Sequence, residues 1–288
     1  MAALYRAPAK INLTLEVLAR RADGLHGIRS VMVPLELSDE LIVESSERFT
    51  FVCDRTELEG DENLAVRALG ALGTLPAYRV ELRKHVPVQA GLGGGSSDAA
   101  AVLGAAMRGA FGTPPPADWP QVARALGSDV PFFLAGTGAL VEGTGERVTP
   151  LGAMPRWHVV VVKPPVGVST ADAYALVDRT ERPMRSRALS VSLAAATALQ
   201  RGDFQAVQSL LHNDFQSAIA AESPPVATAL DALAAAGAVH PLLAGSGSCV
   251  FALAQDAQAA AEIAQRLSLP TEYARWTTAF AQSPEWRA

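Results

Sequence analysis

Three features of the sequence predict an α+β fold divided into two domains. Apolar residues make up 49% of the 288 residues and charged residues 18%, which is a globular composition. Strand-like runs dominate the first half, whereas three or four helical stretches separate the strands of the second half. The pattern changes between Leu151 and Pro155. We therefore expect domains at residues 1–155 and 156–288, with the extreme C-terminus able to return to the first domain.

The first strand has the clearest period of two. Its alternating sets are Ile11, Leu13, Leu15 and Val17 on one face and Lys10, Asn12, Thr14 and Glu16 on the other. One apolar and one polar face predict a half-buried strand. A turn-rich stretch follows at residues 22–27. The next expected elements are strands at 28–37, 41–45, 49–53 and 78–86, and a helix at 62–72 that Asn63 could cap.

A glycine-rich loop at residues 87–97 then leads into an Ala-rich helix at 98–111. A short helix at 119–126 ends at Gly127, a suitable C-cap, and a strand–turn–strand unit covers 138–148. In the second half we expect a strand at 157–162, followed by helices at 170–177, 189–201, 204–215 and 226–236. Paired strands within 240–253, a helix at 257–267 and a strand at 272–279 complete the chain's expected elements.

Charge and cysteine content argue against several classes of protein. The net charge is −5, and non-specific nucleic-acid binding depends on Lys and Arg, so no nucleic-acid partner is expected. Two cysteines without a Cys-x-x-Cys pair form neither a secreted disulfide scaffold nor a metal knuckle. The chain shows no signal-peptide stretch and no apolar run long enough to span a membrane. We expect a cytoplasmic protein without a membrane partner.

The glycine-rich loop is the strongest chemical signal. Its sequence GLGGGSS lies between a predicted strand and a predicted helix. Glycines permit positive φ angles, and successive N–H groups together with a helix N-terminus then form an anion site. Phosphate is the expected guest, and the hydroxyls of Ser96 and Ser97 suit a phosphate or a bound cation. The structural alternative is a flexible turn of small residues.

The sequence of this loop does not match other known glycine-rich motifs. No Lys follows the glycines, as a P-loop requires, and Ser96 stands where a Rossmann fingerprint needs glycine. The hydrolase motif Gly-x-Ser-x-Gly is absent both here and at Gly245.

Several polar residues outside the loop are candidates for catalysis or binding. Asp129 lies between a helix end and Pro131, where it is either a fixed proton acceptor or an ordinary turn aspartate. Lys10 shares a strand face with Asn12, so both line one cleft or both are solvated. His26 stands in a turn, where histidines are more often structural or solvent-facing.

Two candidates lie in the second half. Thr170 and Tyr174 are four residues apart on a predicted helix and share a face, where Tyr174 is otherwise a core aromatic. The stretch that begins at Gly245 and Ser246 is either a tight hairpin or a binding loop.

Five segments in order resemble a known superfamily. They are PAKINL at residues 8–13, DGLH at 23–26, PVQAGLGGGSS at 87–97, GSDVPF at 127–132 and LAGSGS at 243–248. They are similar to segments of the galactokinase, homoserine kinase, mevalonate kinase and phosphomevalonate kinase superfamily, the GHMP kinases. The segments span residues 8 to 248, which is nearly the whole chain.

The resemblance implies a fold and a set of roles. The fold would be the two-domain GHMP kinase fold, with an N-terminal ribosomal-protein-S5-like domain, a C-terminal ferredoxin-like domain and the active site between them. Lys10 and Asp129 would be catalytic, with Asp129 as the base. The implied ATP-binding residues are Pro87, Val88, Gln89, Ala90, Gly91, Leu92, Gly93, Gly94, Gly95, Ser96 and Ser97. The implied substrate-binding residues are Asn12, Leu25, His26, Thr170, Tyr174, Gly245 and Ser246.

The implied activity is transfer of the γ-phosphate of ATP to a hydroxyl, with Mg²⁺ accompanying ATP and its ligands unassigned, Ser97 being one possibility. The nearest branch acts on an alcohol that carries a cytidine diphosphate group in the non-mevalonate route to isoprenoid precursors. Leu25 stands where that branch usually has a tyrosine, so Tyr174 would be the only aromatic ring stacked on the cytosine. Gln89 stands at a loop position where the family more often has a small residue. The alternatives are a mevalonate- or homoserine-type kinase and, outside enzymes, an RNA-binding module.

Overall fold

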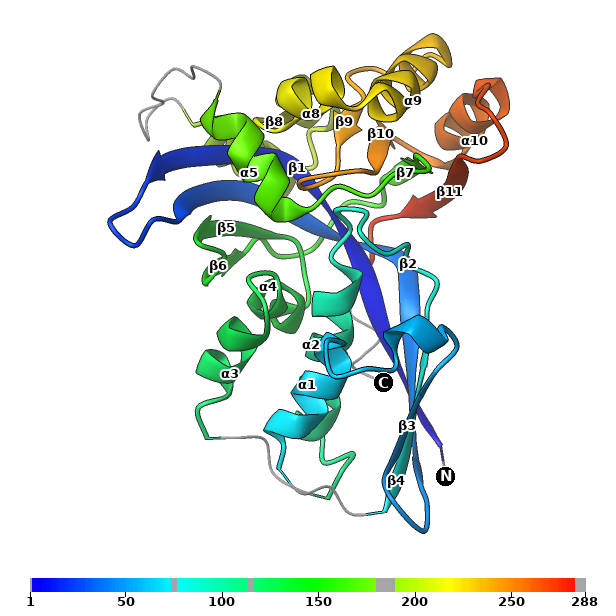
Figure 1. Cartoon of the computed structure of the whole chain (residues 1–288). Helices are drawn as coiled ribbons and strands as arrows, with labels where there is room; N and C mark the ends of the chain where they lie inside the picture. Colours follow the sequence, from blue (N-terminus) through cyan, green and yellow to red (C-terminus); the bar gives the residue numbers. More distant parts are fainter. Residues whose placement is uncertain (1, 74–76, 113–116, 180–189, 283–288) are drawn as a thin grey trace.

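Two sheets and the helices packed on them form the computed structural model of the chain, which describes residues 2–73, 77–112, 117–179 and 190–282 (Figure 1). The first sheet has the strand order β3-β4-β2-β1-β8, with β5 beside β2 and β6 beside β5. The second sheet has the order β11-β7-β10-β9. This combination of mainly antiparallel sheets and packed helices agrees with the predicted α+β class.

The first sheet is built on a long antiparallel pair. Its strands are β1 (Ala3–Arg20), β2 (His26–Ser45), β3 (Thr50–Cys53), β4 (Tyr78–Arg83), β5 (Ala139–Gly143), β6 (Arg147–Pro150) and β8 (His212–Asn213). The two strands predicted at 28–37 and 41–45 are the single strand β2. The short turn between β1 and β2 projects from one end of the molecule (Figure 1).

Helices cover one face of the first sheet (Figure 1). They are α1 (Leu64–Ala71), α2 (Gly94–Met107), α3 (Trp119–Leu126) and α4 (Val130–Ala135), with a 3-10 turn η1 (Thr56–Leu58) before them. The side chain of Asn63 caps α1 through the Ala65 N–H. The start predicted for the next helix, residue 98, is wrong. Helix α2 begins at Gly94, because Gly93 takes a left-handed conformation and acts as its N-cap.

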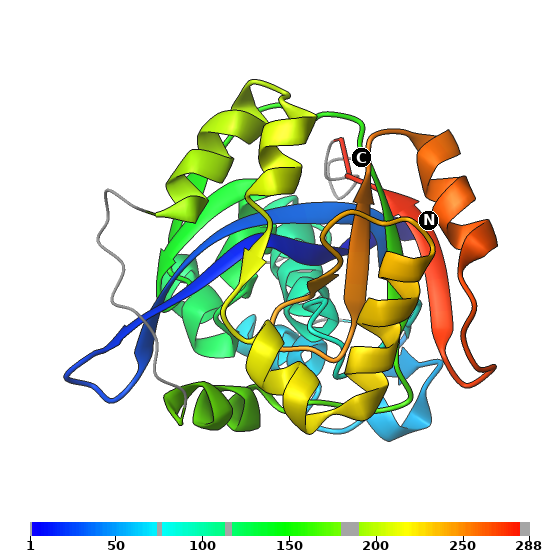
Figure 2. The same ribbon diagram turned by 90° about the horizontal axis from the view of Figure 1, so that it is seen from above.

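The second sheet has four of the remaining helices packed against one face, whereas the helices at residues 191–200 and 204–209 pack between its other face and the first sheet (Figure 2). Its strands are β7 (His158–Lys163), β9 (Leu242–Leu243), β10 (Val250–Ala254) and β11 (Ala274–Ala279). The helices are α5 (Thr170–Asp178), α6 (Val191–Gln200), α7 (Phe204–Ser209), α8 (Gln216–Glu222), α9 (Pro224–Ala235) and α10 (Ala257–Arg266). Position 189, where one helix was expected to begin, lies outside the described residues.

The helix predicted at 204–215 is wrong in its second half. Helix α7 ends at Ser209, and the chain then forms β8, which pairs in parallel with β1. The backbone N–H of Asp214 donates to the carbonyl of Leu15, so a segment of the second half completes the first sheet. A two-residue strand has no periodicity that a sequence could reveal. Helix α8, which follows directly, was not predicted.

The half-buried character predicted for the first strand is also wrong. Every residue from Ala9 to Val17 is buried, including the polar set. Ile11 and Leu13 pack in a cluster with the second sheet, whereas the side chains of Lys10 and Asn12 line an internal cleft. The polar face is therefore buried among polar partners and is not solvated.

Contacts between the two halves are extensive. Besides β8, the backbone N–H of Ala281 donates to Pro34 O, and Phe280 bridges to Leu35 on β2. The division at residue 155 stays a prediction. Within the described residues, no helix is both long enough and apolar enough to cross a membrane.

Candidate active site

One cleft between the two halves collects almost all of the predicted site residues. Its volume is about 530 Å³, which suits a small-molecule ligand. Its wall includes Lys10 and Asn12 of β1, residues 87–96 of the loop, Asp129, Thr170 and Tyr174 of α5, and the segment at Gly245–Gly247. Ser97 is buried and is not part of this lining, and Leu25 and His26 line a neighbouring cavity.

The positive φ angles that the glycines of the loop predict occur at only some of them. Gly91 has φ +75° and Gly93 has φ +72°, whereas Gly94 and Gly95 already belong to the first turn of α2. A Cβ at Gly91 would collide with the carbonyl of Ala244. At Gly93 it would lie 2.9 Å from the Phe133 ring. The start of α2 thus faces the cleft with its free N–H groups, which is the geometry of a phosphate site.

Lys10 and Asp129 meet in the cleft. Lys10 Nζ lies 3.5 Å from Asp129 Oδ2 and donates to Asn12 Oδ1 at 2.9 Å. The backbone N–H of Lys10 donates to Leu92 O at 2.9 Å, which fixes the loop against β1. Asp129 is the N-cap residue of α4 but makes no side-chain bond to that helix. Its carboxylate therefore faces Lys10 and the cleft.

The second half closes the cleft through the loop between β9 and β10. A Cβ at Gly245 would lie 2.9 Å from Gly91 O and 3.1 Å from Lys10 Nζ, so this loop touches both parts of the site. The Thr170 and Ser246 hydroxyls are 3.1 Å apart. Asn213 donates from Nδ2 to Leu243 O and Gly245 O and so holds the loop in place.

Asn213 was missed by the sequence reasoning. It was assigned to a helix interior, where an Asn carries no special meaning. The available signal was the polar run His212, Asn213 and Asp214 between the apolar pair Leu210–Leu211 and Phe215. Polar residues at a strand–helix junction commonly bind backbone groups, as the Asn213 side chain does by accepting from Phe215 N–H at 2.9 Å.

A second cavity adjoins the cleft. Its volume is about 1110 Å³, and it shares Ser128, Thr144 and Tyr174 with the cleft wall. The His26 and Tyr174 rings lie parallel there, with centroids 5.6 Å apart and planes 12° from parallel. Leu25 beside them is 56% exposed. The structure therefore brings together the residues expected at a base site, with Leu25 on its open side.

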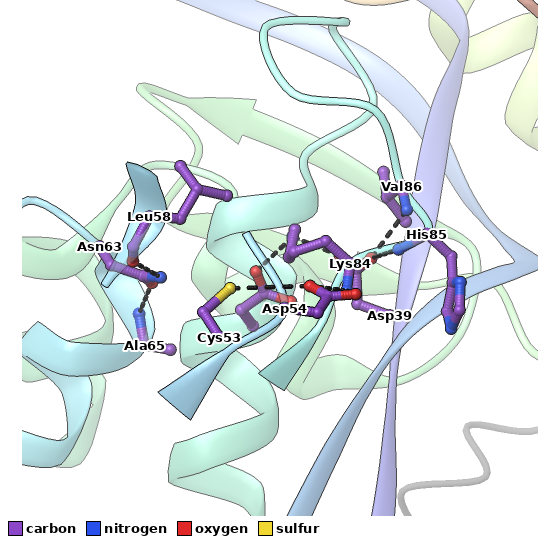
Figure 3. A network of polar contacts seen from close by, with 10 residues as sticks. Asp39, Cys53, Asp54, Leu58, Asn63, Ala65, Lys84, His85 and Val86 are labelled. Atoms are coloured by element: carbon purple, nitrogen blue, oxygen red, sulfur yellow. Dashed lines mark hydrogen bonds and ion pairs between the residues drawn. The ribbon is translucent and has the colours of Figure 1, made fainter. Parts of the chain in front are cut away.

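A buried ion network lies behind the phosphate loop (Figure 3). Lys84 Nζ contacts both Asp39 Oδ2 and Asp98 Oδ2 at 2.5 Å. Asp39 also accepts from the backbone N–H groups of His85 and Val86, at the start of the loop. The three side chains thus join β2, the end of β4 and the first turns of α2, so they hold the loop at both ends.

Two carboxylates share the single ammonium group of this network. Burial alone would lower the pKa of Lys84, but Asp98 and Asp39 outweigh it and raise that pKa. Burial raises the pKa of Asp98 well above its usual value, against the opposing effect of Lys84. The sequence reasoning singled out none of the three residues, although Lys84 stands three positions before Pro87.

Lys84→Met is expected to lower the free energy of unfolding by about 3–5 kcal/mol, because it leaves two buried carboxylates without their cation. Urea denaturation followed by circular dichroism measures the change. Arg83→Met is the matched control, since Arg83 is 47% exposed and its ion pair with Glu81 contributes about 1 kcal/mol or less. Equal losses in the two variants would contradict the network.

A metal ion has few protein ligands available here. Among the residues that the structure describes, no group of three or more His, Cys, Asp and Glu side chains is arranged to hold one. Ser97 Oγ finds no hydrogen-bond partner there, but it is buried away from the cleft wall, whereas Ser96 lines the cleft. Oxygen donors such as Ser96 suit Mg²⁺ that is bound mainly by phosphates and water.

Comparisons with known proteins agree with this geometry. The model of the GHMP kinases N terminal domain matches residues 63–137, and that of the GHMP kinases C terminal matches residues 195–270. The solved homoserine kinase from Cytophaga hutchinsonii has a TM-score of 0.70 at 18% identity, covering 98% of this chain and 96% of that one. At that identity it shows the common fold alone, and the predicted two-domain GHMP kinase fold is confirmed.

More similar relatives share one name. The 4-diphosphocytidyl-2-C-methyl-D-erythritol kinase of Deinococcus radiodurans is 42% identical over 274 residues, which cover 90% of this chain and 88% of that protein. A crystal structure of 4-(cytidine 5'-diphospho)-2C-methyl-D-erythritol kinase has a TM-score of 0.76 at 35% identity, covering 98% of this chain and all of that one (100%). The chain therefore belongs to the 4-diphosphocytidyl-2-C-methyl-D-erythritol kinase family within the GHMP kinases.

Proposed function

We propose that the protein transfers the γ-phosphate of ATP to the 2-hydroxyl of 4-diphosphocytidyl-2-C-methyl-D-erythritol, a step toward isoprenoid precursors in the non-mevalonate route. The observation that carries this proposal is the Lys10–Asp129 pair, 3.5 Å apart, in the same cleft as the glycine-rich loop. Phosphoryl transfer depends on placing a nucleophile in line with a held phosphate, and this cleft offers both parts.

Asp129 is the proton acceptor in this proposal. As the 2-hydroxyl oxygen attacks the γ-phosphorus, its proton passes to the Asp129 carboxylate, and the bond from that phosphorus to the bridging oxygen of ADP breaks. Lys10 donates to Asn12 and lies beside Asp129, so its charge stabilises both the carboxylate and the negative charge on the transferring group. Asn12 in turn donates to Ser30 Oγ at 2.7 Å, which fixes its orientation.

The loop and the start of α2 bind the phosphates of ATP. Gly91 and Gly93 bring the backbone close to the ligand, and the helix N-terminus stabilises the negative charge. Mg²⁺ bound with ATP would neutralise part of the charge on the β- and γ-phosphates, and the Ser96 hydroxyl in the cleft wall would be a candidate ligand for it.

The adjoining cavity takes the cytidine part of the substrate. Tyr174 offers the ring on which the base stacks, Leu25 offers apolar contact, and His26 offers an imidazole edge. Mevalonate and homoserine carry no base, so neither would use this cavity. The solved mevalonate and homoserine kinases, at 14% and 18% identity, share the fold alone. Membership of a kinase family also disfavours the RNA-binding module.

ADP release in the presence of Mg-ATP tests the proposal. Three alcohols are compared at equal concentration: 4-diphosphocytidyl-2-C-methyl-D-erythritol, mevalonate and homoserine. We expect ADP from the first alone, with a product one phosphate heavier by mass spectrometry. ADP production from mevalonate or homoserine, without any from the cytidine compound, would assign the chain a different substrate.

A further inference from the structure

We propose that a β-bulge in β1, spanned by the buried hydroxyl of Ser30, positions the charge of Lys10 for phosphoryl transfer. The inference rests on the proposed function and adds a positioning residue behind the cleft wall. Ser30 lies on β2, has no exposed surface (0%) and is not part of the cleft lining. Any effect of Ser30 on the reaction therefore passes through its neighbours.

The bulge interrupts the pairing of β1 with β2 beside the cleft. Asn12 pairs with Met32, but Thr14 pairs with Val31, so β1 has one residue more than β2 at this point. An extra residue on one strand turns the side chains that follow it to the opposite face. Side chains before and after the bulge should therefore have different surroundings.

The neighbours of these side chains agree with that reversal. Lys10 and Asn12, before the bulge, line the cleft, and after it Leu15 does so. Thr14 instead bonds to the first turn of α6, where its Oγ1 donates to Ser192 Oγ at 2.9 Å. In a regular strand Thr14 would share a face with Asn12. The bulge thus determines which polar side chains of β1 reach the cleft.

The Ser30 hydroxyl joins the two sides of the bulge. Its oxygen lies 2.6 Å from Thr14 O and 2.7 Å from Asn12 Nδ2. A hydroxyl has one proton and a carbonyl only accepts, so the Ser30 proton is donated to Thr14 O. The Ser30 oxygen is then an acceptor toward Asn12, and the atom of Asn12 that faces it has to be the amide nitrogen.

The orientation of the Asn12 amide determines which group Lys10 meets. With Nδ2 turned toward Ser30, Oδ1 faces Lys10 Nζ and accepts from it at 2.9 Å. A rotated amide would present its N–H groups to an ammonium group, which also only donates. Lys10 Nζ lies 3.5 Å from Asp129 Oδ2, so the bond to Asn12 helps to fix the ammonium group beside the proton acceptor.

Helix α6 anchors the bulge from the second half of the chain. Ser192 Oγ donates to Arg29 O at 3.1 Å, so toward Thr14 it is the acceptor. Thr14 Oγ1 in turn accepts from the backbone N–H of Val31 at 3.0 Å. The residues Ser30, Thr14 and Ser192 are all fully buried (0% exposed). Because a buried polar group without a partner is costly, this network favours a single geometry of the bulge.

Ser30→Ala is expected to lower kcat by about tenfold, the scale of one hydrogen bond, in ADP release from Mg-ATP and 4-diphosphocytidyl-2-C-methyl-D-erythritol. The KM for ATP should stay within about twofold of the wild type, because the phosphate loop is unchanged. Ser30→Cys keeps a weak donor and acceptor at the same place. Its kcat should lie between the other two values, which gives a second measurement if Ser30→Ala folds poorly.

A double-mutant cycle separates positioning from a merely structural role. In Asn12→Ala there is no amide left to orient, so adding Ser30→Ala should change kcat by less than about twofold. A loss of about tenfold that persists on top of Asn12→Ala would overturn the inference, since Ser30 would then act by another route.

Ser38→Ala is the matched control, because Ser38 is also a buried serine of β2 (7% exposed) but lies outside the cleft wall. It should keep the wild-type kcat. Equal kcat values in Ser30→Ala and Ser38→Ala would overturn the role of Ser30 and leave the proposed function intact. A wild-type protein that releases no ADP with the cytidine compound would instead overturn the proposed function, and this inference with it.

Discussion

Asp129→Asn is expected to lower kcat by about 10²–10⁴-fold while ATP still binds. The amide keeps the size of the side chain but cannot accept the hydroxyl proton, and a general base contributes a factor of that order. Asp129 makes no capping bond to α4, so its loss as a carboxylate should not destabilise that helix. Single-turnover phosphoryl transfer and calorimetric ATP titration measure the two quantities separately.

Asp118→Asn is the matched control. Asp118 is the N-cap residue of α3, also makes no capping bond to its own helix, and is exposed on the surface. It should keep the wild-type kcat. Combining Asp129→Asn with Lys10→Met should cost far less than the product of the two single losses, because the pair acts as a unit. Wild-type turnover in Asp129→Asn would remove this residue from the mechanism.

The fold class and the cleft residues could be predicted because each left a local mark in the sequence. Period-two alternation marked β1, and a glycine run between a strand and a helix marked the phosphate loop. The ordered segments at residues 8–13, 87–97, 127–132 and 243–248 indicated the family, and they come together in one cleft. The catalytic and binding roles of these residues stay predictions until variants are measured.

Other features depend on distant parts of the chain and left no such mark. Strand β8 exists because Asp214 N–H finds Leu15 O almost 200 positions away in the chain. Lys84 lies within the strand predicted at residues 78–86, and only the approach of Asp39 and Asp98 reveals its role. The sequence likewise left open whether the polar face of β1 faces solvent or lines a cleft, because alternation alone does not distinguish the two.

The loop offers the second large effect. Gly93→Val is expected to weaken ATP binding by roughly 100-fold or more, equivalent to about 2.7 kcal/mol. Gly93 has φ +72° and is the N-cap residue of α2, and a β-branched residue is strongly disfavoured at such an angle. Its Cβ would also lie 2.9 Å from Phe133 and 3.1 Å from Lys10 Cγ. Relief of the strain at this φ angle, or of the contacts with Phe133 and Lys10, would shift the backbone and displace the N–H groups that face the phosphates.

Gly109→Val separates this effect from backbone strain in general. Gly109 has φ +78°, close to that of Gly93, but a Cβ there would have no atom within 4 Å, and the residue is not part of the cleft wall. Both variants should lose some stability, because each forces a side chain into a left-handed conformation. Calorimetry should show weakened ATP binding for Gly93→Val alone. Equal ATP affinity in the two variants would exclude the start of α2 as the phosphate site. Backbone strain, which both variants share, would then explain any change in ATP affinity without displacement of the N–H groups.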